Sequence, residues 1–146
     1  PWDGGRVFFS DGGSTAVEVA LKMAYHLWCH HGEPQRKLFV GFENAYHGDT
    51  FGAMAVGRYR RFFGPYEPLL FDAAQLPLDP TRLDEFLTAR GSEVAAVIAE
   101  PLVQGAAGMR MYPADTLRDL FAVAKRHGVL FIADEVMTGN RTGRRW

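Results

Sequence analysis

Residues 129 to 139 read V-L-F-I-A-D-E-V-M-T-G, five apolar residues that run directly into two carboxylates. The run Val129 to Ala133 is uninterrupted by polar side chains, which predicts a buried strand of a parallel sheet. Asp134 then stands at the carboxyl end of that strand, and Glu135 beside it is expected to face away. Ligands of such sheets bind outside the carboxyl ends of the strands. Asp134 is therefore the first candidate functional residue.

Short apolar runs alternate with helical patterns along the rest of the chain. The other predicted strands are Val7 to Phe9, Leu38 to Phe42 and Val94 to Ala99. The predicted helices run from the capping-box sequence T-A-V-E at 15–18 to about 31, from Asp79-Pro80 to Gly91, and from Ala114 to His127. This order predicts an α/β fold, a three-layer sandwich around a mostly parallel sheet.

The first predicted helix has a narrow polar stripe and an otherwise apolar circumference. Glu18, Lys22 and His26 fall on the stripe, so we expect the helix to pack against more than one layer. Glu18 and Lys22 are four residues apart, a spacing that predicts an ion pair facing water.

The composition limits the classes of function. A chain of 146 residues with 47% hydrophobic and 23% charged residues is typical of one globular domain, and a net charge of −1 favours neither nucleic acid nor an anionic membrane as a partner. No apolar run approaches the roughly 20 residues that span a bilayer. The single cysteine, Cys29, indicates a reducing compartment such as the cytoplasm. Because the chain opens at Pro1 rather than methionine, we expect it to be an excerpt of a longer protein.

Two polar segments each have a functional and a simpler interpretation. In W-C-H-H-G-E at 28–33, adjacent cysteine and histidine side chains point in different directions on a helix, so we expect no metal site. R-Y-R-R-F-F at 58–63 interleaves arginine with aromatic residues, as single-strand nucleic-acid binders do. The near-neutral charge instead favours a solvated loop that joins a pocket or a subunit interface.

D-G-G-S-T at 11–15 is a glycine-rich turn that leads into a helix. Gly12 and Gly13 allow close approach of the backbone, and Ser14 adds a hydroxyl donor, which together suit a phosphate at the helix N-terminus. A tight turn with helix caps explains the same residues. The absent third glycine favours a single phosphate group over a pyrophosphate.

Two further features suit a planar, nitrogen-containing ligand. Tyr46 and His47 follow a strand, where an aromatic ring can lie over such a ligand, although a packed loop aromatic is an equally good interpretation. A carboxylate such as Asp134 beside a pyridine nitrogen favours the protonated ring, which then accepts electrons from a carbanion. The alternative for Asp134 is a polar cap at the end of a strand.

Four motifs, in order, resemble the class III aminotransferases, which have fold type I and use pyridoxal phosphate. They are S-D-G-G-S-T-A-V-E-V-A-L-K-M-A, Y-H-G-D-T-F-G-A-M, A-E-P-L-V-Q-G-A-A-G-M-R-M-Y and A-D-E-V-M-T-G. The second and third are most similar to members of the biotin pathway. The resemblance extends over nearly the whole chain, and four motifs in order are far more specific than any one of them.

The resemblance implies roles for particular residues. Gly13 and Ser14 match the family's phosphate-binding pair. Tyr46 matches the tyrosine that lies over the cofactor ring and also faces the substrate. Asp134 matches the catalytic partner of the pyridine nitrogen. His47 and Glu100 match positions close to the cofactor, where they are expected to shape the pocket without transferring protons.

The resemblance also implies a reaction. An amino donor passes its amino group to the cofactor, which then aminates a ketone. In the biotin-pathway members the donor is S-adenosylmethionine, the acceptor is 8-amino-7-oxononanoate and the product is 7,8-diaminononanoate, and the family forms homodimers. The alternatives are another class III enzyme that acts on ω-amino acids, or a non-catalytic remnant of one.

By the same resemblance, residues 1–146 are expected to be part of the cofactor-binding large domain. The family's Schiff-base lysine lies about thirty residues beyond the position of Asp134. The N-terminal segment and the small C-terminal domain are expected to lie outside this chain as well. G-N-R-T-G at 139–143 departs from the family's G-F-G-R-T-G, which predicts a changed turn at Asn140 and a shifted Arg141.

Overall fold

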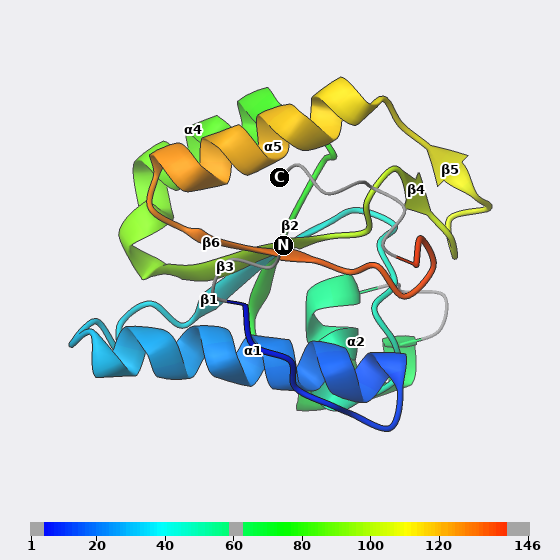
Figure 1. Ribbon diagram of the computed structural model, residues 1–146, viewed down its shortest axis with the longest axis horizontal. Coiled ribbons are helices and arrows are strands. Elements are labelled where there is room, and N and C mark those ends of the chain that lie inside the picture. The colour runs from blue at the N-terminus through cyan, green and yellow to red at the C-terminus, as the bar shows by residue number, and fades with distance from the viewer. Residues whose placement is uncertain (1–4, 59–62, 140–146) are drawn as a thin grey trace.

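The computed structural model describes residues 5–58 and 63–139 as three layers, a sheet with helices on both faces (Figure 1). The strands of the main sheet are β1 (Leu38–Phe42), β2 (Ala73–Leu76), β3 (Val94–Ala99) and β6 (Leu130–Ala133). The α-helices are α1 (Gly13–His30), α2 (Phe51–Gly57), α4 (Pro80–Arg90) and α5 (Ala114–Arg126). Short 3-10 helices η1 (Gly64–Leu69) and η2 (Gly91–Glu93) and a hairpin of β4 (Val103–Gln104) with β5 (Arg110–Met111) complete the described elements. The predicted three-layer α/β fold is confirmed.

The main sheet is parallel and has the strand order β2-β1-β3-β6. All six residues of β3 are buried, as the continuous apolar run V-A-A-V-I-A predicts for a central strand. β3 and β6 pair from Ala96 with Leu130 to Ala99 with Ala133. Because the strands are parallel, the residues that follow β1, β3 and β6 emerge at the same edge of the sheet.

Helices α4 and α5 cover one face of the sheet, and α1 and α2 cover the other (Figure 1). Successive side chains of β3 point to opposite faces of the sheet, since Val97 belongs to one buried cluster and Ile98 to the other. Leu83 and Leu120 pack on the Val97 side, and Leu21 packs on the Ile98 side. The sheet is thus the shared wall of two apolar cores.

The helix boundaries on the α4–α5 face follow the sequence signals. The Asp79 carboxylate accepts a hydrogen bond from the Thr81 backbone N–H at 2.8 Å, and Pro80 occupies the first position of α4. After α5, Gly128 has a φ of +64°, the left-handed conformation that glycine adopts readily at the end of a helix. The predicted helices at 80–91 and 114–127 are confirmed within one residue at each end.

Two strand predictions need correction. Val7 to Phe9 is not a strand, and its three side chains are 64% to 89% exposed. An apolar run becomes a strand only where a sheet edge accepts its backbone hydrogen bonds, and no described strand pairs with it. The predicted strand at 129–133 forms as β6, but its side chains are half-buried or exposed because β6 has only one described neighbour, β3.

The start and the coverage of α1 also differ from the sequence prediction. The helix begins at Gly13 without a side-chain cap, so the predicted capping box of Thr15 with Glu18 is wrong. The Glu18 carboxylate accepts a hydrogen bond from the Thr50 hydroxyl at 2.8 Å and makes no described ion pair with Lys22. Only one face of α1 packs on the sheet, since large apolar residues elsewhere on it are 40% to 49% exposed. These residues are Met23, Tyr25 and Leu27.

Several described elements were not predicted, namely β2, α2, the β4–β5 hairpin and the 3-10 helices η1 and η2. The A-A-Q-L sequence of β2 lacks β-branched residues, and α2 is a seven-residue helix with two glycines, so neither carries a strong local signal. The changed turn predicted at Asn140 and Arg141 lies outside the described residues, as do residues 59–62 of the arginine-aromatic segment. In the described ranges, no helix combines the length and the apolar character that a membrane crossing requires.

The isolated 146-residue chain is expected to self-associate. Val7, Phe8, Phe9, Met111 and Val136 are 64% to 89% exposed, and β2 and β6 are the outermost described strands of the sheet. Exposed apolar side chains and unpaired strand edges both favour association. Sedimentation velocity should therefore detect dimers or larger species at micromolar concentration. A monodisperse monomer that unfolds cooperatively contradicts this expectation.

Candidate functional site

A buried pair of side chains lies at the carboxyl edge of the sheet. His47 follows β1 and Asp134 follows β6, and the Nδ1 atom of His47 lies 2.6 Å from an Oδ2 atom of Asp134. Their side chains are 0% and 5% exposed. The other oxygen of Asp134 accepts a hydrogen bond from the backbone N–H of Val136 at 3.1 Å. The backbone N–H of Asp134 donates to the carbonyl oxygen of Ala99, so the carboxylate is fixed in place by its main chain as well.

The second ring nitrogen of His47, Nε2, is buried and has no hydrogen-bond partner in the described part of the chain. Buried polar atoms of folded proteins almost always have a partner, because an unpaired one loses its bond to water without compensation. This nitrogen therefore indicates the position of a water molecule or of another polar atom on the side of the His47 ring away from Asp134.

Glu100 joins two loops behind this pair. It follows β3 directly and is 7% exposed. One carboxylate oxygen accepts the backbone N–H of Tyr46 at 3.2 Å, and the other accepts that of Gly105 at 3.0 Å. Burial raises the pKa of Glu100, and the two N–H donors oppose that rise because they stabilise the charged form. Glu100 therefore connects the Tyr46 loop to the β4–β5 hairpin.

Tyr46 presents its ring to an open hollow. Its hydroxyl donates a hydrogen bond to the Asp49 carboxylate at 3.0 Å, and its ring stacks on that of Phe63 at a centroid distance of 6.0 Å. Burial raises the pKa of Tyr46, so the phenol is neutral at physiological pH. The hollow has a volume of about 1080 Å³, and Tyr46, Phe63 and Ala106 line it. This volume is sufficient for a small-molecule ligand.

The predicted phosphate turn lies beside the carboxylate. Gly13 is the first residue of α1, where backbone N–H groups have no acceptor within the helix. A Cβ atom at Gly13 would lie 2.8 Å from a methyl group of Val136, two residues after Asp134. The Ser14 hydroxyl forms hydrogen bonds with Thr50. The six candidate residues thus belong to four segments that contact one another at one edge of the sheet.

Sequence reasoning missed two residues of this region. Thr50 contacts both Ser14 and Glu18. Gln104 is 1% exposed and donates a hydrogen bond from Nε2 to the Glu43 carbonyl oxygen at 2.9 Å. A glutamine inside the short apolar sequence L-V-Q-G was a usable signal for Gln104. For Thr50, which ends the polar pair D-T before a helix, the local sequence carries no comparable signal.

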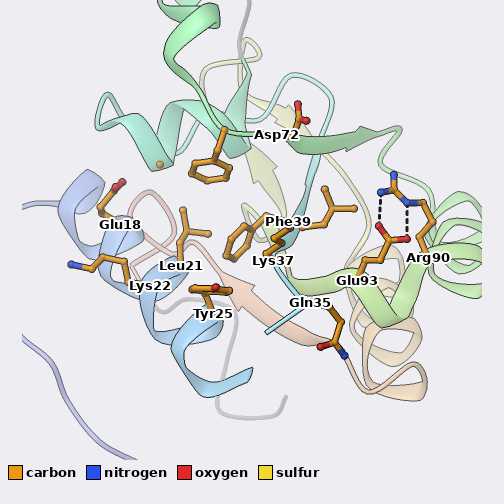
Figure 2. A pocket seen from close by; sticks show the side chains of 13 residues that line it. Glu18, Leu21, Lys22, Tyr25, Gln35, Lys37, Phe39, Asp72, Arg90 and Glu93 are labelled. Carbon is orange, nitrogen blue, oxygen red and sulfur yellow. Dashed lines mark hydrogen bonds and ion pairs between the residues drawn. The ribbon is translucent and has the colours of Figure 1, made fainter. Parts of the chain in front are cut away.

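The lysines lie elsewhere. A groove of about 610 Å³ extends from Glu18 on α1 past the start of β1 to Glu93 in η2. Lys22 and Lys37 line it, and Figure 2 shows them with Leu21 and Phe39 between the ends of the groove. Lys37 precedes β1 and therefore stands at the amino edge of the sheet. Lys125 is exposed near the end of α5. All three lysines of the chain are thus away from the His47–Asp134 pair.

The histidine-rich end of α1 holds no described metal-ligand cluster. Within 5–58 and 63–139, no three side chains of histidine, cysteine, aspartate or glutamate come close enough to hold a metal ion. His31 places Nδ1 2.8 Å from the Leu27 carbonyl oxygen, whereas the rings of His26 and His30 lie 4.3 Å apart on the helix surface.

The family model described as "Aminotransferase class-III" matches residues 1–146. The chain is 51% identical to an adenosylmethionine-8-amino-7-oxononanoate aminotransferase of Synechococcus elongatus, over 94% of this chain and 36% of that protein. It is 42% identical to the protein of the same name from Geobacter sulfurreducens, over 94% of this chain and 35% of that protein. The chain therefore spans about a third of the length of these curated relatives.

Solved structures agree with the sequence matches. The crystal structure of an adenosylmethionine-8-amino-7-oxononanoate aminotransferase from Methanocaldococcus jannaschii superposes with a TM-score of 0.85 at 37% identity, over 90% of this chain and 31% of that one. A PLP-bound amine transaminase from an uncultivated Pseudomonas species superposes with a TM-score of 0.79 at 38% identity, over 88% of this chain and 33% of that one.

Proposed function

The chain belongs to the class III aminotransferases, and we propose that it carries the cofactor-binding sheet of a pyridoxal-phosphate enzyme that aminates 8-amino-7-oxononanoate with S-adenosylmethionine as donor. The names of its relatives support these substrates. The observation that carries the proposal is the buried Asp134 carboxylate at the end of β6, held by His47 at 2.6 Å. The product of this reaction is 7,8-diaminononanoate.

The residues present fit the cofactor at three points. Asp134 offers a buried carboxylate for the ring nitrogen, held in place by the Nδ1 atom of His47. Gly13 and Ser14 offer the helix start and the hydroxyl for the phosphate. Tyr46 offers an aromatic ring that also faces the open hollow. When bound, pyridoxal phosphate supplies the electron sink for chemistry at the substrate carbon next to the amino group.

Each residue then has a distinct physical role in the proposal. The negative charge of Asp134 favours a proton on the ring nitrogen, because a carboxylate within hydrogen-bond distance stabilises the cation. His47 orients that carboxylate. Glu100 fixes the Tyr46 backbone, and hence the ring that covers the cofactor. Tyr46 separates the cofactor from the hollow in which substrate binds.

Two further parts of the proposal concern the whole protein. We propose that it acts as a homodimer, as its membership of the class III aminotransferases implies. We also propose a cytoplasmic location, which suits the one free cysteine of the sequence, Cys29.

The choice of amino donor tests the proposed reaction directly. A full-length protein that carries these residues is expected to form 7,8-diaminononanoate when given S-adenosylmethionine and 8-amino-7-oxononanoate, measured by mass spectrometry. Turnover with ω-amino acids and none with S-adenosylmethionine would favour the alternative within class III. Failure to bind pyridoxal phosphate at all would point to a non-catalytic remnant.

Asp134→Asn in the same full-length protein is expected to lower kcat by about a hundredfold or more while pyridoxal phosphate still binds. The amide keeps the size of the side chain but removes the charge that favours a protonated ring nitrogen. Asp119→Asn is the matched control, since Asp119 is exposed on α5. Near-normal turnover of Asp134→Asn, measured by steady-state kinetics with cofactor content from absorbance, would remove Asp134 from the assignment.

The 146-residue chain alone is expected to form no specific covalent bond with pyridoxal phosphate. Lys22, Lys37 and Lys125 are its only lysines, and all lie away from Asp134. Borohydride reduction followed by peptide mapping should find scattered, partial labelling of these surface amines. Stoichiometric labelling of a single lysine is the contrary result.

A further inference from the structure

We propose that Thr50 and Glu18 are positioning residues that hold the Ser14 hydroxyl against the loop carrying Tyr46 and His47, and that they thereby set the affinity of the site for a phosphate group. The inference rests on the proposed pyridoxal-phosphate function and deepens it. It concerns two residues to which the sequence motifs assigned no role in the site.

The contacts form a short chain of hydrogen bonds between α1 and the residues before α2. The Ser14 Oγ atom lies 2.9 Å from the backbone nitrogen of Thr50 and 2.9 Å from its Oγ1 atom. The Thr50 Oγ1 atom lies 2.8 Å from an Oε2 atom of Glu18. All three side chains are half-buried. Ser14 and Thr50 are 36 residues apart in the sequence, so this contact is part of the tertiary structure.

The number of available protons determines which atom donates and which accepts in each of these hydrogen bonds. The Thr50 hydroxyl has one proton, and the Glu18 carboxylate only accepts, so that proton points to Glu18. The Thr50 oxygen is then an acceptor toward Ser14, while the Thr50 backbone N–H donates to Ser14 Oγ. Ser14 is therefore held from two sides in the free site. When its own proton turns to a stronger, anionic acceptor, the bond to the Thr50 hydroxyl oxygen is lost, but the Thr50 backbone N–H still holds the Ser14 oxygen, and the Thr50–Glu18 bond keeps that N–H in place. A phosphate oxygen is such an acceptor.

Two glycines make the close approach possible. Gly48 has a φ of +116°, and a Cβ atom there would overlap the Cβ and Oγ atoms of Ser14. A Cβ atom at Gly52 would overlap the Glu18 carboxylate. The loop before α2 and the first turn of α2 thus rest directly on the first two turns of α1. Figure 2 shows Glu18 extending from α1 toward α2, and not along its own helix toward Lys22.

The position of this contact gives it a specific consequence. Ser14 belongs to the part of the site proposed to bind phosphate, and the loop from Tyr46 to Thr50 belongs to the part proposed to bind the ring. The Ser14–Thr50–Glu18 chain therefore fixes one part relative to the other. Its loss is expected to weaken the binding of a phosphorylated ligand and to leave that of an unphosphorylated analogue nearly unchanged.

The test compares pyridoxal phosphate with pyridoxal in the cofactor-free, full-length protein that carries these residues, by fluorescence titration. Thr50→Val is expected to lower the affinity for pyridoxal phosphate about tenfold, as for loss of a hydrogen bond that involves a charged group, with little change for pyridoxal. Thr50→Ser restores the affinity, because it restores the hydroxyl. Glu18→Gln is expected to produce a smaller loss in the same direction. Thr88→Val, on the exposed surface of α4, is the matched control.

Equal losses for pyridoxal phosphate and pyridoxal, or no loss for either, overturn the positioning role. Thr50→Val changes the loop itself and can lower the stability of the protein. Glu18→Gln leaves the loop sequence intact, so the affinities measured with this variant still test the positioning role if Thr50→Val does not fold. Failure of the unaltered protein to bind pyridoxal phosphate is a different result, because it contradicts the proposed function itself.

Discussion

The contact between His47 and Asp134 is the constraint on which the rest of this site depends. A carboxylate that is removed from water costs free energy unless a partner compensates it, and Asp134 has its partner at 2.6 Å, 87 residues away in the sequence. That contact requires the loop after β1 to reach across the end of β3 to the end of β6. The parallel strand order β2-β1-β3-β6 makes this reach short.

The same edge of the sheet explains why the remaining residues gather there. Glu100 ends the strand between β1 and β6, and its two carboxylate oxygens hold the backbone on either side, at Tyr46 and Gly105. The start of α1 joins from the opposite direction, through Gly13 against Val136. The sheet thus carries loops whose side chains lie together at one edge. This is the usual arrangement by which α/β proteins separate stability from chemistry.

Much of this organisation could be predicted from local sequence. The apolar run before Asp134, the Asp79-Pro80 helix start and the central strand at 94–99 each carry their signal within a few residues. The hydrogen-bond partners of the site residues could not be predicted from local sequence. The contacts of His47 with Asp134 and of Ser14 with Thr50 join residues far apart in the sequence, so they depend on the tertiary structure. Val7 to Phe9 shows the converse error: its composition favours a strand, but a strand also needs a neighbour. Glu18 matched a local capping pattern, yet a hydroxyl 32 residues away binds it instead.

The interaction between the cofactor's ring nitrogen and the Asp134 carboxylate is measured most directly by the nitrogen-15 chemical shift of pyridoxal phosphate that is labelled at that ring nitrogen. In the full-length protein with cofactor bound, a ring nitrogen beside the Asp134 carboxylate should show the shift of a protonated pyridinium, and it should keep this shift to a higher pH than in the Asp134→Asn variant, because the carboxylate stabilises the cation. A shift typical of neutral pyridine in the unaltered protein, with the same value in the Asp134→Asn variant, would contradict the assignment of this carboxylate as the partner of the ring nitrogen.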